Sequence, residues 1–239
     1  MLKAVFFDLD GTLLRMDESE FVKGYFSLLV KKMKAYGYDK ELLIRTIWDG
    51  TALMVTNDGK KTNEEVFWNL FASVYGEEKL KDRPIFDSFY SDEFKKMKSY
   101  CQDNPLAKEI VFFTHSQGLK TVLSTNPLFP RAGQKTRLSF LGLKDSDFDF
   151  VSDYSNSSFC KPNPSYFASL LSLMDLKPEE VILFGNNTLE DGDCASYSHI
   201  DTYLVKGYLI HSDKAKGTYP EIGLEDIIPT IEKEMESRA

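Results

Sequence analysis

Two carboxylates come directly after a short apolar run near the N-terminus. Residues 4–7 (AVFF) lead into residues 8–13 (DLDGTL), so Asp8 and Asp10 would lie at the end of a strand. Such runs are typical of strands buried on both faces, and parallel sheets bind ligands at the carboxyl ends of their strands. Two buried carboxylates need a cation or hydrogen-bond donors beside them, and Mg²⁺ prefers hard oxygen ligands. The plainer interpretation is a strand end, a turn and a helix cap.

The string FFDLDGTLL at residues 6–14 resembles the first motif of the haloacid dehalogenase superfamily. In that family the first Asp attacks phosphorus, while the second protonates the leaving group and then activates water. The resemblance therefore implies that Asp8 is the nucleophile and Asp10 the general acid/base. A carboxylate nucleophile divides one difficult step into two through a phosphoenzyme, and a neighbouring carboxyl group can carry the proton.

Two further segments follow in the order that this family has. Residues 122–124 run into Thr125 and Asn126, which resemble the second motif and would bind the phosphoryl group through the Thr125 hydroxyl and nearby donors. Lys161, in residues 160–164 (CKPNP), resembles the lysine-proline motif, in which a fixed ammonium balances the charge of nucleophile and phosphate. Taken alone, a strand-ending Thr and a solvent-facing Lys are the plainer interpretations.

The last motif is where the sequence departs from the family. Residues 185–191 (GNNTLED) follow another apolar run, and the family usually has an Asp after the glycine and a second acid four or five residues later. Asn186 takes the first position and Asp191 the second, with Glu190 a weaker candidate and Asp193 one step too far. Because an amide brings no negative charge, we expect Mg²⁺ to bind less tightly. The metal ligands that the resemblance implies are Asp8, Asp10 through its backbone carbonyl, Asp191 and Asn186.

The elements that would position these residues alternate between strands and helices. Helical patterns cover residues 105–118 and 164–175, each beginning at or beside a proline. Short apolar runs occur at residues 3–7, 121–124, 148–151, 181–184 and 202–205. This alternation predicts an α/β fold with a doubly wound, parallel, Rossmann-like sheet.

About ninety residues between the first two strands carry no strand pattern, which is far more than a simple crossover needs. Helical spacing of apolar residues favours helices at residues 19–36, 39–48, 62–76 and 84–100. We therefore predict a core made of residues 1–14 and 100–239, with residues 15–99 as a helical cap. The aromatic residues of this insert are expected to form its own core, with one or two at the interdomain cleft; they include Trp48, Phe67, Trp68 and Phe71.

Composition narrows the partners. The net charge of −8 would repel a polyanion, so no nucleic acid is expected to bind. The three cysteines have no CxxC spacing, which favours reduced thiols over disulfides or zinc. No run reaches the roughly 18 apolar residues of a membrane span, and no signal peptide pattern opens the chain. We expect a cytoplasmic protein that binds a phosphorylated small molecule; the oligomeric state leaves no trace in the sequence.

Three functions fit these residues. The first is an Mg²⁺-dependent phosphatase acting on a small-molecule phosphomonoester through an aspartyl-phosphate on Asp8. The second is a phosphotransferase such as a sugar phosphomutase, which keeps both acids; dehalogenases of the family lack the second, and this chain has Asp10. The third is a catalytically silent binding protein, for which Asn186 is the sole argument. The set of motifs favours the first function.

Overall fold

The computed structural model describes residues 1–238 and has a six-stranded, fully parallel sheet. Its strand order is β3-β2-β1-β4-β5-β6, so the direction of winding reverses between β1 and β4. The strands are β1 (Ala4–Phe7), β2 (Lys120–Leu123), β3 (Phe150–Val151), β4 (Val181–Gly185), β5 (Asp201–Val205) and β6 (Glu221–Ile222). The first five lie where the apolar runs predicted them, and β6 was not predicted.

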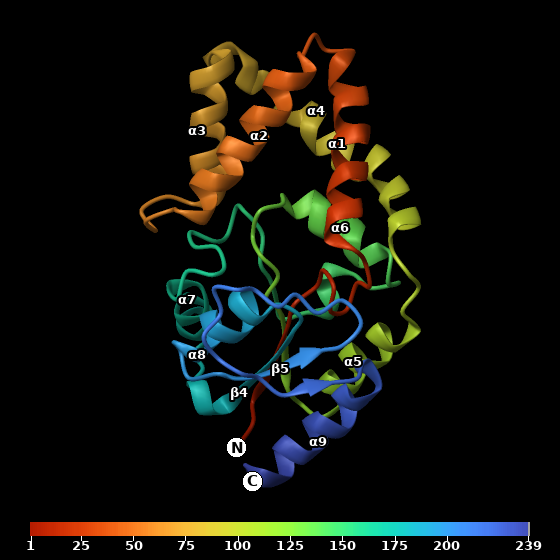
Figure 1. Ribbon diagram of the computed structural model, residues 1–239, viewed down its shortest axis with the longest axis vertical. Coiled ribbons are helices and arrows are strands. Elements are labelled where there is room, and N and C mark those ends of the chain that lie inside the picture. The colour runs from red at the N-terminus through yellow and green to blue at the C-terminus, as the bar shows by residue number, and fades with distance from the viewer. Residues whose placement is uncertain (239) are drawn as a thin grey trace.

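Helices cover both faces of this sheet. Since successive side chains of a strand point to opposite faces, neighbouring residues of β1 pack against different helices. Val5 and Phe7 pack in the hydrophobic cluster that holds α5 and α9, whereas Ala4 and Phe6 pack in the cluster that holds α7 and α8. These helices are α5 (Pro105–Ser116), α7 (Ser165–Met174), α8 (Cys194–Ser196) and α9 (Ile227–Ser237). The predicted doubly wound α/β class is confirmed, as Figure 1 shows.

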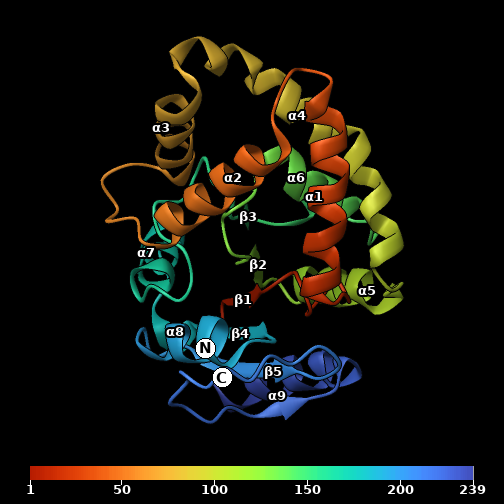
Figure 2. The same ribbon diagram turned by 45° about the horizontal axis from the view of Figure 1, so that its top comes forward.

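The segment between β1 and β2 is helical, and within residues 1–238 it holds no strand of the sheet. Except for α5, which covers the sheet, its helices lie together at one end of the molecule, opposite both termini (Figures 1 and 2). They are α1 (Glu18–Lys34), α2 (Lys40–Val55), α3 (Asn63–Tyr75), a 3₁₀ segment (Glu77–Asp82), α4 (Arg83–Ser91) and a second 3₁₀ segment (Glu93–Tyr100). The helix expected at 84–100 is thus two elements. The division into a core and a cap at residues 14 and 99 stays a prediction.

The N-terminus of α3 is bound to loops of the sheet domain. Thr62 and Glu65 form a capping box, with the Thr62 N–H donating to Glu65 Oε2 at 2.8 Å. One residue further on, the Asn63 N–H donates to the carbonyl of Ser157 at 2.9 Å, and Asn63 Nδ2 donates to the carbonyl of Pro127 at 3.3 Å. The insert is therefore in contact with the loops that follow β2 and β3.

One helix beside the strands' carboxyl ends was not predicted. α6 (Arg131–Ser139) follows the loop after β2 and begins after Pro130. Its Thr136 hydroxyl donates to the carbonyl of Tyr90 at 2.7 Å, which makes a second contact between the sheet domain and the insert. Within residues 1–238, no helix has the length and apolar character that a membrane crossing requires.

Candidate active site

The end of β1 places Asp8 inside the protein. The Asp8 N–H donates to the carbonyl of Phe184 at 2.8 Å, which continues the pairing of β1 with β4 by one residue. The chain then turns at Gly11, whose φ of +78° suits glycine. A Cβ on Gly11 would stand 2.1 Å from Asn186 Nδ2, so glycine also lets the Asn186 side chain approach the turn. The motif after β1 and the motif after β4 are therefore packed against each other.

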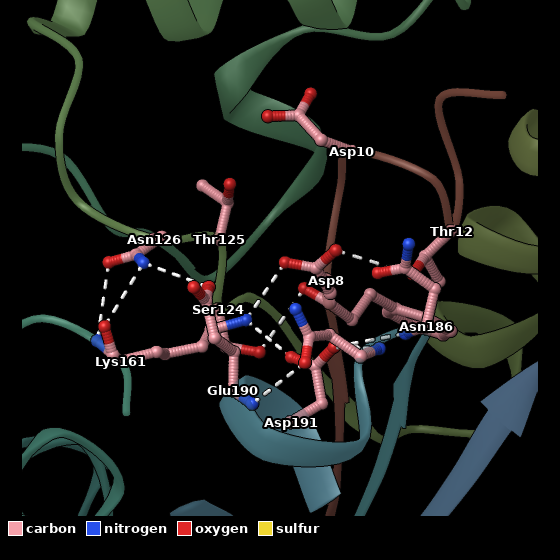
Figure 3. A network of polar contacts seen from close by, with 12 residues as sticks. Asp8, Asp10, Thr12, Ser124, Thr125, Asn126, Lys161, Asn186, Glu190 and Asp191 are labelled. Carbon is pink, nitrogen blue, oxygen red and sulfur yellow. Dashed lines mark hydrogen bonds and ion pairs between the residues drawn. The ribbon is translucent and has the colours of Figure 1, made fainter. Parts of the chain in front are cut away.

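Lys161 joins two of the carboxylates that the sequence singled out. Its Nζ donates to Asp8 Oδ1 at 2.8 Å and to Asp191 Oδ1 at 2.5 Å, and its side chain is 1% exposed. Burial acts to lower the pKa of Lys161, but the charges of Asp191 and Asp8 outweigh it and raise that pKa well above its ordinary value. A permanently charged ammonium thus lies beside the Asp8 carboxyl group (Figure 3).

The electrostatics of Asp8 call for a further positive charge. Burial raises the pKa of Asp8, the Lys161 ammonium lowers it, and the neighbouring Asp191 raises it again; the outcome is a pKa of about 8. With Lys161 as its only strong counter-charge, Asp8 would carry a proton at neutral pH. A bound cation would favour the ionised form, which is the form that can act as a nucleophile.

Asp191 organises the loop after β4. Its Oδ2 accepts the N–H groups of Asn186 at 2.9 Å and Asn187 at 3.0 Å, and the residue is 1% exposed. A Cβ on Gly185 would lie 2.3 Å from Asp191 Cγ, so this contact needs a glycine before Asn186. Since its other oxygen accepts from Lys161, Asp191 positions both the loop and the ammonium.

Asn186 has a hydrogen bond that an aspartate could not make. Its Nδ2 donates to the carbonyl of Tyr208 at 2.7 Å, and its own backbone carbonyl accepts from the Ile210 N–H at 2.8 Å. The amide side chain therefore ties the loop after β4 to the loop after β5. The side-chain carbonyl oxygen of Asn186 is the group that remains to face a cation or a water. The part of Asn186 in metal binding stays a prediction.

Thr125 and Asn126 follow β2 and line the same pocket as Asp8. Thr125 is buried, and its backbone carbonyl accepts from the Tyr166 hydroxyl at 2.9 Å. Asn126 Oδ1 accepts the Lys161 N–H at 3.2 Å, while its Nδ2 donates to Glu190 Oε2 at 3.0 Å. All seven residues singled out from the sequence thus line this pocket or, in the case of Lys161, contact its carboxylates.

Asp10 has a partner that the sequence did not reveal. An ion pair joins its Oδ2 to Arg137 of α6, which also hydrogen-bonds Gln134 and lies 4.3 Å above the Phe129 ring. Figure 3 shows the Asp10 carboxyl group directed away from Asp8 and Lys161. Among the described residues, Asp10 Oδ1 is buried without a hydrogen-bond partner. Asp10 is therefore held in a retracted position.

Glu18 is the second residue that sequence reasoning missed. It lies in the first turn of α1, lines the pocket of Asp8, and is exposed to solvent at its mouth. Although the residue as a whole is exposed, the pocket removes water from its carboxyl group, and this desolvation together with the charges of Asp10, Glu190 and Asp191 raises the pKa of Glu18 to about 7. The cavity at this pocket is about 30 Å³, which suits an ion or one or two waters and is too small for a phosphate ester. The acids that line it are Asp8, Asp10, Glu18, Glu190 and Asp191.

The chemistry of these donors fits a hard cation held by a mixed set of ligands. Within residues 1–238, no three side chains of His, Cys, Asp or Glu form a metal site by themselves. A cation would need Asp8 together with the Asp10 backbone carbonyl, the Asn186 amide oxygen, and water or phosphate, as Mg²⁺ commonly does. The part of Asp191 in metal binding stays a prediction, because both of its oxygens already accept hydrogen bonds from Lys161 and the loop N–H groups. Asp193 belongs elsewhere, because it accepts from the Lys216 N–H at 2.7 Å and the Tyr219 hydroxyl at 2.6 Å.

The chain belongs to the haloacid dehalogenase-like hydrolases, because the model of that family matches residues 2–191. Among similar solved structures is a 2-haloacid dehalogenase from Pseudomonas syringae pv. Tomato DC3000, with 16% identity, a TM-score of 0.64 and 100% of both chains covered. A HAD phosphatase from Thermococcus onnurineus has 18% identity and a TM-score of 0.55, covering 96% of this chain and 98% of that one.

A β-phosphoglucomutase from Clostridium difficile has 16% identity and a TM-score of 0.53, covering 99% of this chain and 98% of that one. At these identities the similarity shows the fold alone, and the three neighbours differ in the reaction that their names state. The comparison with curated proteins finds no match.

Proposed function

We propose that this hydrolase is an Mg²⁺-dependent phosphatase that cleaves a small-molecule phosphomonoester through an aspartyl-phosphate on Asp8. The observation that carries the proposal is the buried contact of Asp8 with the Lys161 ammonium at 2.8 Å, beside Asp191 and with a second acid two residues further on. A carboxylate held beside a fixed cation can bring a dianionic phosphate and a nucleophile together.

The residues divide the work of two displacements. In the first, an Asp8 oxygen bonds to phosphorus, the ester bond breaks, and Asp10 gives its proton to the leaving oxygen. In the second, Asp10 takes a proton from water, the water oxygen bonds to phosphorus, and the Asp8–phosphorus bond breaks to release phosphate. Lys161 and the Thr125 hydroxyl would stabilise the phosphoryl oxygens in both steps. Bound Mg²⁺ would neutralise phosphate charge and favour ionised Asp8.

The retracted position of Asp10 requires a movement before either proton transfer. Its ion pair with Arg137 must open for the carboxyl group to reach a leaving oxygen beside Asp8. The small volume of the Asp8 pocket also indicates that a movement is needed, because a phosphate ester requires more room than about 30 Å³. Opening of the insert relative to the sheet would enlarge the pocket, as lids do in many enzymes. The Asp10–Arg137 ion pair joins two parts of the sheet domain, so it would have to open by a local change.

A phosphate-release screen tests this proposal. Purified protein is assayed against sugar phosphates, nucleotides, small acid phosphates and phosphate esters of ring-bearing alcohols, with Mg²⁺ and with EDTA. We expect Mg²⁺-dependent release from at least one class, and Asp8→Asn should abolish it while the melting temperature is kept. Asp213→Asn, the same substitution at an exposed position, serves as the control and should keep full activity.

Release that Asp8→Asn leaves unchanged would refute the covalent mechanism. Transfer of the phosphoryl group to a sugar, with no net release, would instead identify a mutase. A protein that binds no Mg²⁺ at millimolar concentration and releases no phosphate would be the silent binding protein.

A further inference from the structure

A second cavity lies between the helical insert and the sheet domain. Its volume is about 140 Å³, and nine of its sixteen lining residues are aromatic. The insert contributes residues of α1, α2, α3 and α4, while Leu128, Phe129, Pro130 and Tyr154 come from loops of the sheet domain. Both tryptophans of the chain, Trp48 and Trp68, line it. We refer to it as the aromatic cavity.

The polar atoms around the aromatic cavity already pair with one another. The hydroxyls of Tyr25 and Tyr90 share a hydrogen bond of 2.9 Å, and Trp68 Nε1 donates to the Tyr154 hydroxyl at 3.3 Å. Besides these paired groups, the polar side chains of the lining are Thr51, Asp87 and the Trp48 indole, and among the described residues no Lys, Arg or His lines it. Sugar hydroxyls or a second phosphate would lose hydrogen bonds to water there without replacement, so the lining selects an apolar group.

The size of the aromatic cavity is close to that of one six-membered ring. An apolar cavity of about 150 Å³ in a protein interior stays dry and binds benzene. The present cavity has about 140 Å³ and a mainly apolar lining, in which Trp48 is half exposed and Asp87 carries a carboxyl group. Aromatic walls add edge and stacking contacts with a ring, beyond the area that the ring buries.

An open hollow, which we call the connecting groove, shares lining residues with both the aromatic cavity and the Asp8 pocket. Val22 and Trp48 line both the aromatic cavity and the groove, while Glu18 and Asn186 line both the groove and the Asp8 pocket. Glu18 and Val22 are one turn apart on α1, which corresponds to about 6 Å along the helix. A molecule with its phosphate at Asp8 can therefore extend along α1 toward the aromatic cavity.

We propose that the aromatic cavity binds the leaving group of the substrate, and that this group ends in a single apolar ring of about six atoms. The substrate class is then a phosphate monoester of a ring-bearing alcohol, in place of a sugar phosphate or a nucleotide. This inference rests on the proposed phosphatase function, but binding of the ring itself does not.

Ring binding is measured first, without turnover. Benzyl alcohol is titrated into the protein while tryptophan emission is recorded, because Trp48 and Trp68 both face the cavity. We expect a saturable change at millimolar concentration, which Asp8→Asn should preserve. Val22→Phe and Thr51→Phe place a ring into the cavity and should weaken binding by roughly tenfold or more. Val74→Phe makes the same change on α3 outside the lining and should bind as the wild type does.

Turnover is then compared along a series of phenylalkyl phosphates with linkers of roughly one to four methylene groups. This range matches the spacing of about 6 Å between Glu18 and Val22 along α1. For the best linker we expect kcat/KM roughly tenfold or more above that of methyl phosphate. Val22→Phe and Thr51→Phe should remove most of that advantage, and Val74→Phe should keep it.

The two arms separate the inference from the proposed function. A wild type that shows no saturable ring binding, or cavity-filled variants that bind as well as it does, would overturn the inference. If methyl phosphate is cleaved as fast as every phenylalkyl ester, the inference fails while the phosphatase function stands. If the ring binds and no ester is cleaved, the cavity keeps its ligand class and the phosphatase function fails.

Discussion

Replacing Asn186 with Asp should have opposite effects on stability without and with bound Mg²⁺. In the present structure Asn186 Nδ2 donates to the carbonyl of Tyr208 at 2.7 Å. A carboxylate cannot donate, so Asn186→Asp removes this hydrogen bond and directs an acceptor toward a carbonyl oxygen. It also adds a negative charge near Asp8, whose pKa is already raised to about 8. Without metal, we expect a loss of about 1–3 kcal/mol in the free energy of unfolding.

Bound Mg²⁺ would reverse the sign of this effect. A divalent cation about 4 Å from one added charge gains about 8 kcal/mol at an effective dielectric constant of about 20. Most of this gain is offset, because the carboxylate and the cation both lose hydration. A remainder of about 1.4–2.8 kcal/mol corresponds to Mg²⁺ binding that is about tenfold to a hundredfold tighter.

Thermal unfolding in EDTA and across a Mg²⁺ titration measures both effects without any activity. Asn187→Asp is the matched control, because it adds the same charge one residue away. Asn187 Oδ1 caps the next turn by accepting the N–H groups of Leu189 at 3.0 Å and Glu190 at 3.2 Å, a task that Asp performs equally well.

Asn186→Asp should melt at a lower temperature in EDTA and show a half-saturating Mg²⁺ concentration at least about tenfold below that of the wild type. Asn187→Asp should change both quantities much less. An unchanged or higher half-saturation for Asn186→Asp, or an equal effect in both variants, would refute the assignment of Asn186 to the metal shell.

Three further predictions follow from the same network. Lys161→Met leaves the Asp8 and Asp191 carboxyl groups buried together without their cation. In urea melts at pH 8 it should lower the unfolding free energy by about 3–5 kcal/mol, and it should lower turnover by about 10²- to 10³-fold. An unaltered melt would contradict the ion pair. Arg137→Lys keeps the positive charge but loses the two-pronged guanidinium group that binds both Asp10 and Gln134, so the unfolding free energy should fall by about 1.5–3 kcal/mol. Wild-type stability would mean that these two contacts contribute nothing. The pKa of Asp8 is raised to about 8 in the folded protein. Protonated Asp8 therefore stabilises the metal-free protein fully below about pH 4, and this stabilisation is lost as the pH rises to about 8. Since Mg²⁺ needs the ionised form, calorimetry should show its half-saturation falling about tenfold from pH 6 to pH 7, and a flat profile would refute this.

The sequence predicted the strands well, and it placed the motif residues at one edge of the sheet because the motifs lie in loops after strands of one parallel sheet; their roles stay predictions. Carboxyl ends of parallel strands meet at one edge, so Asp8 after β1 and Asp191 after β4 come together with Lys161, which lies between them in the chain. The short apolar runs were sufficient signals, since strands buried on both faces carry few polar residues, here at the first positions of β2 and β5. The exception is β6, where two residues leave no pattern.

Arg137 and Glu18 could not be found in this way, for two physical reasons. α6 is polar along most of its length and contains a glycine, so its sequence shows no apolar stripe that would predict a helix with a buried arginine. Its contact with Asp10 joins residues 127 positions apart and depends on packing alone. Glu18 reads as an ordinary acid in the first turn of a helix, and only the position of α1 over the Asp8 pocket distinguishes it.

The aromatic residues of the insert were expected to form its core, with one or two at the cleft. Phe71 does lie in the core, fully buried. Trp48, Phe67 and Trp68, however, all line a cavity shared with loops of the sheet domain, which is one residue more than expected. Periodicity places such residues on one face of a helix, but it does not say whether that face is filled by another side chain or left open for a ligand.

Chemical trapping of the phosphoenzyme tests the central claim most directly. The protein is mixed with Mg²⁺ and its best phosphate ester, quenched within the first turnover, and treated with borohydride, which reduces an acyl phosphate to an alcohol. Peptide mass spectrometry should then find homoserine in place of Asp8, with none at Asp10 and none in a sample without substrate. Steady phosphate release with no reduction at position 8, or reduction at another carboxylate, would contradict an aspartyl-phosphate on Asp8.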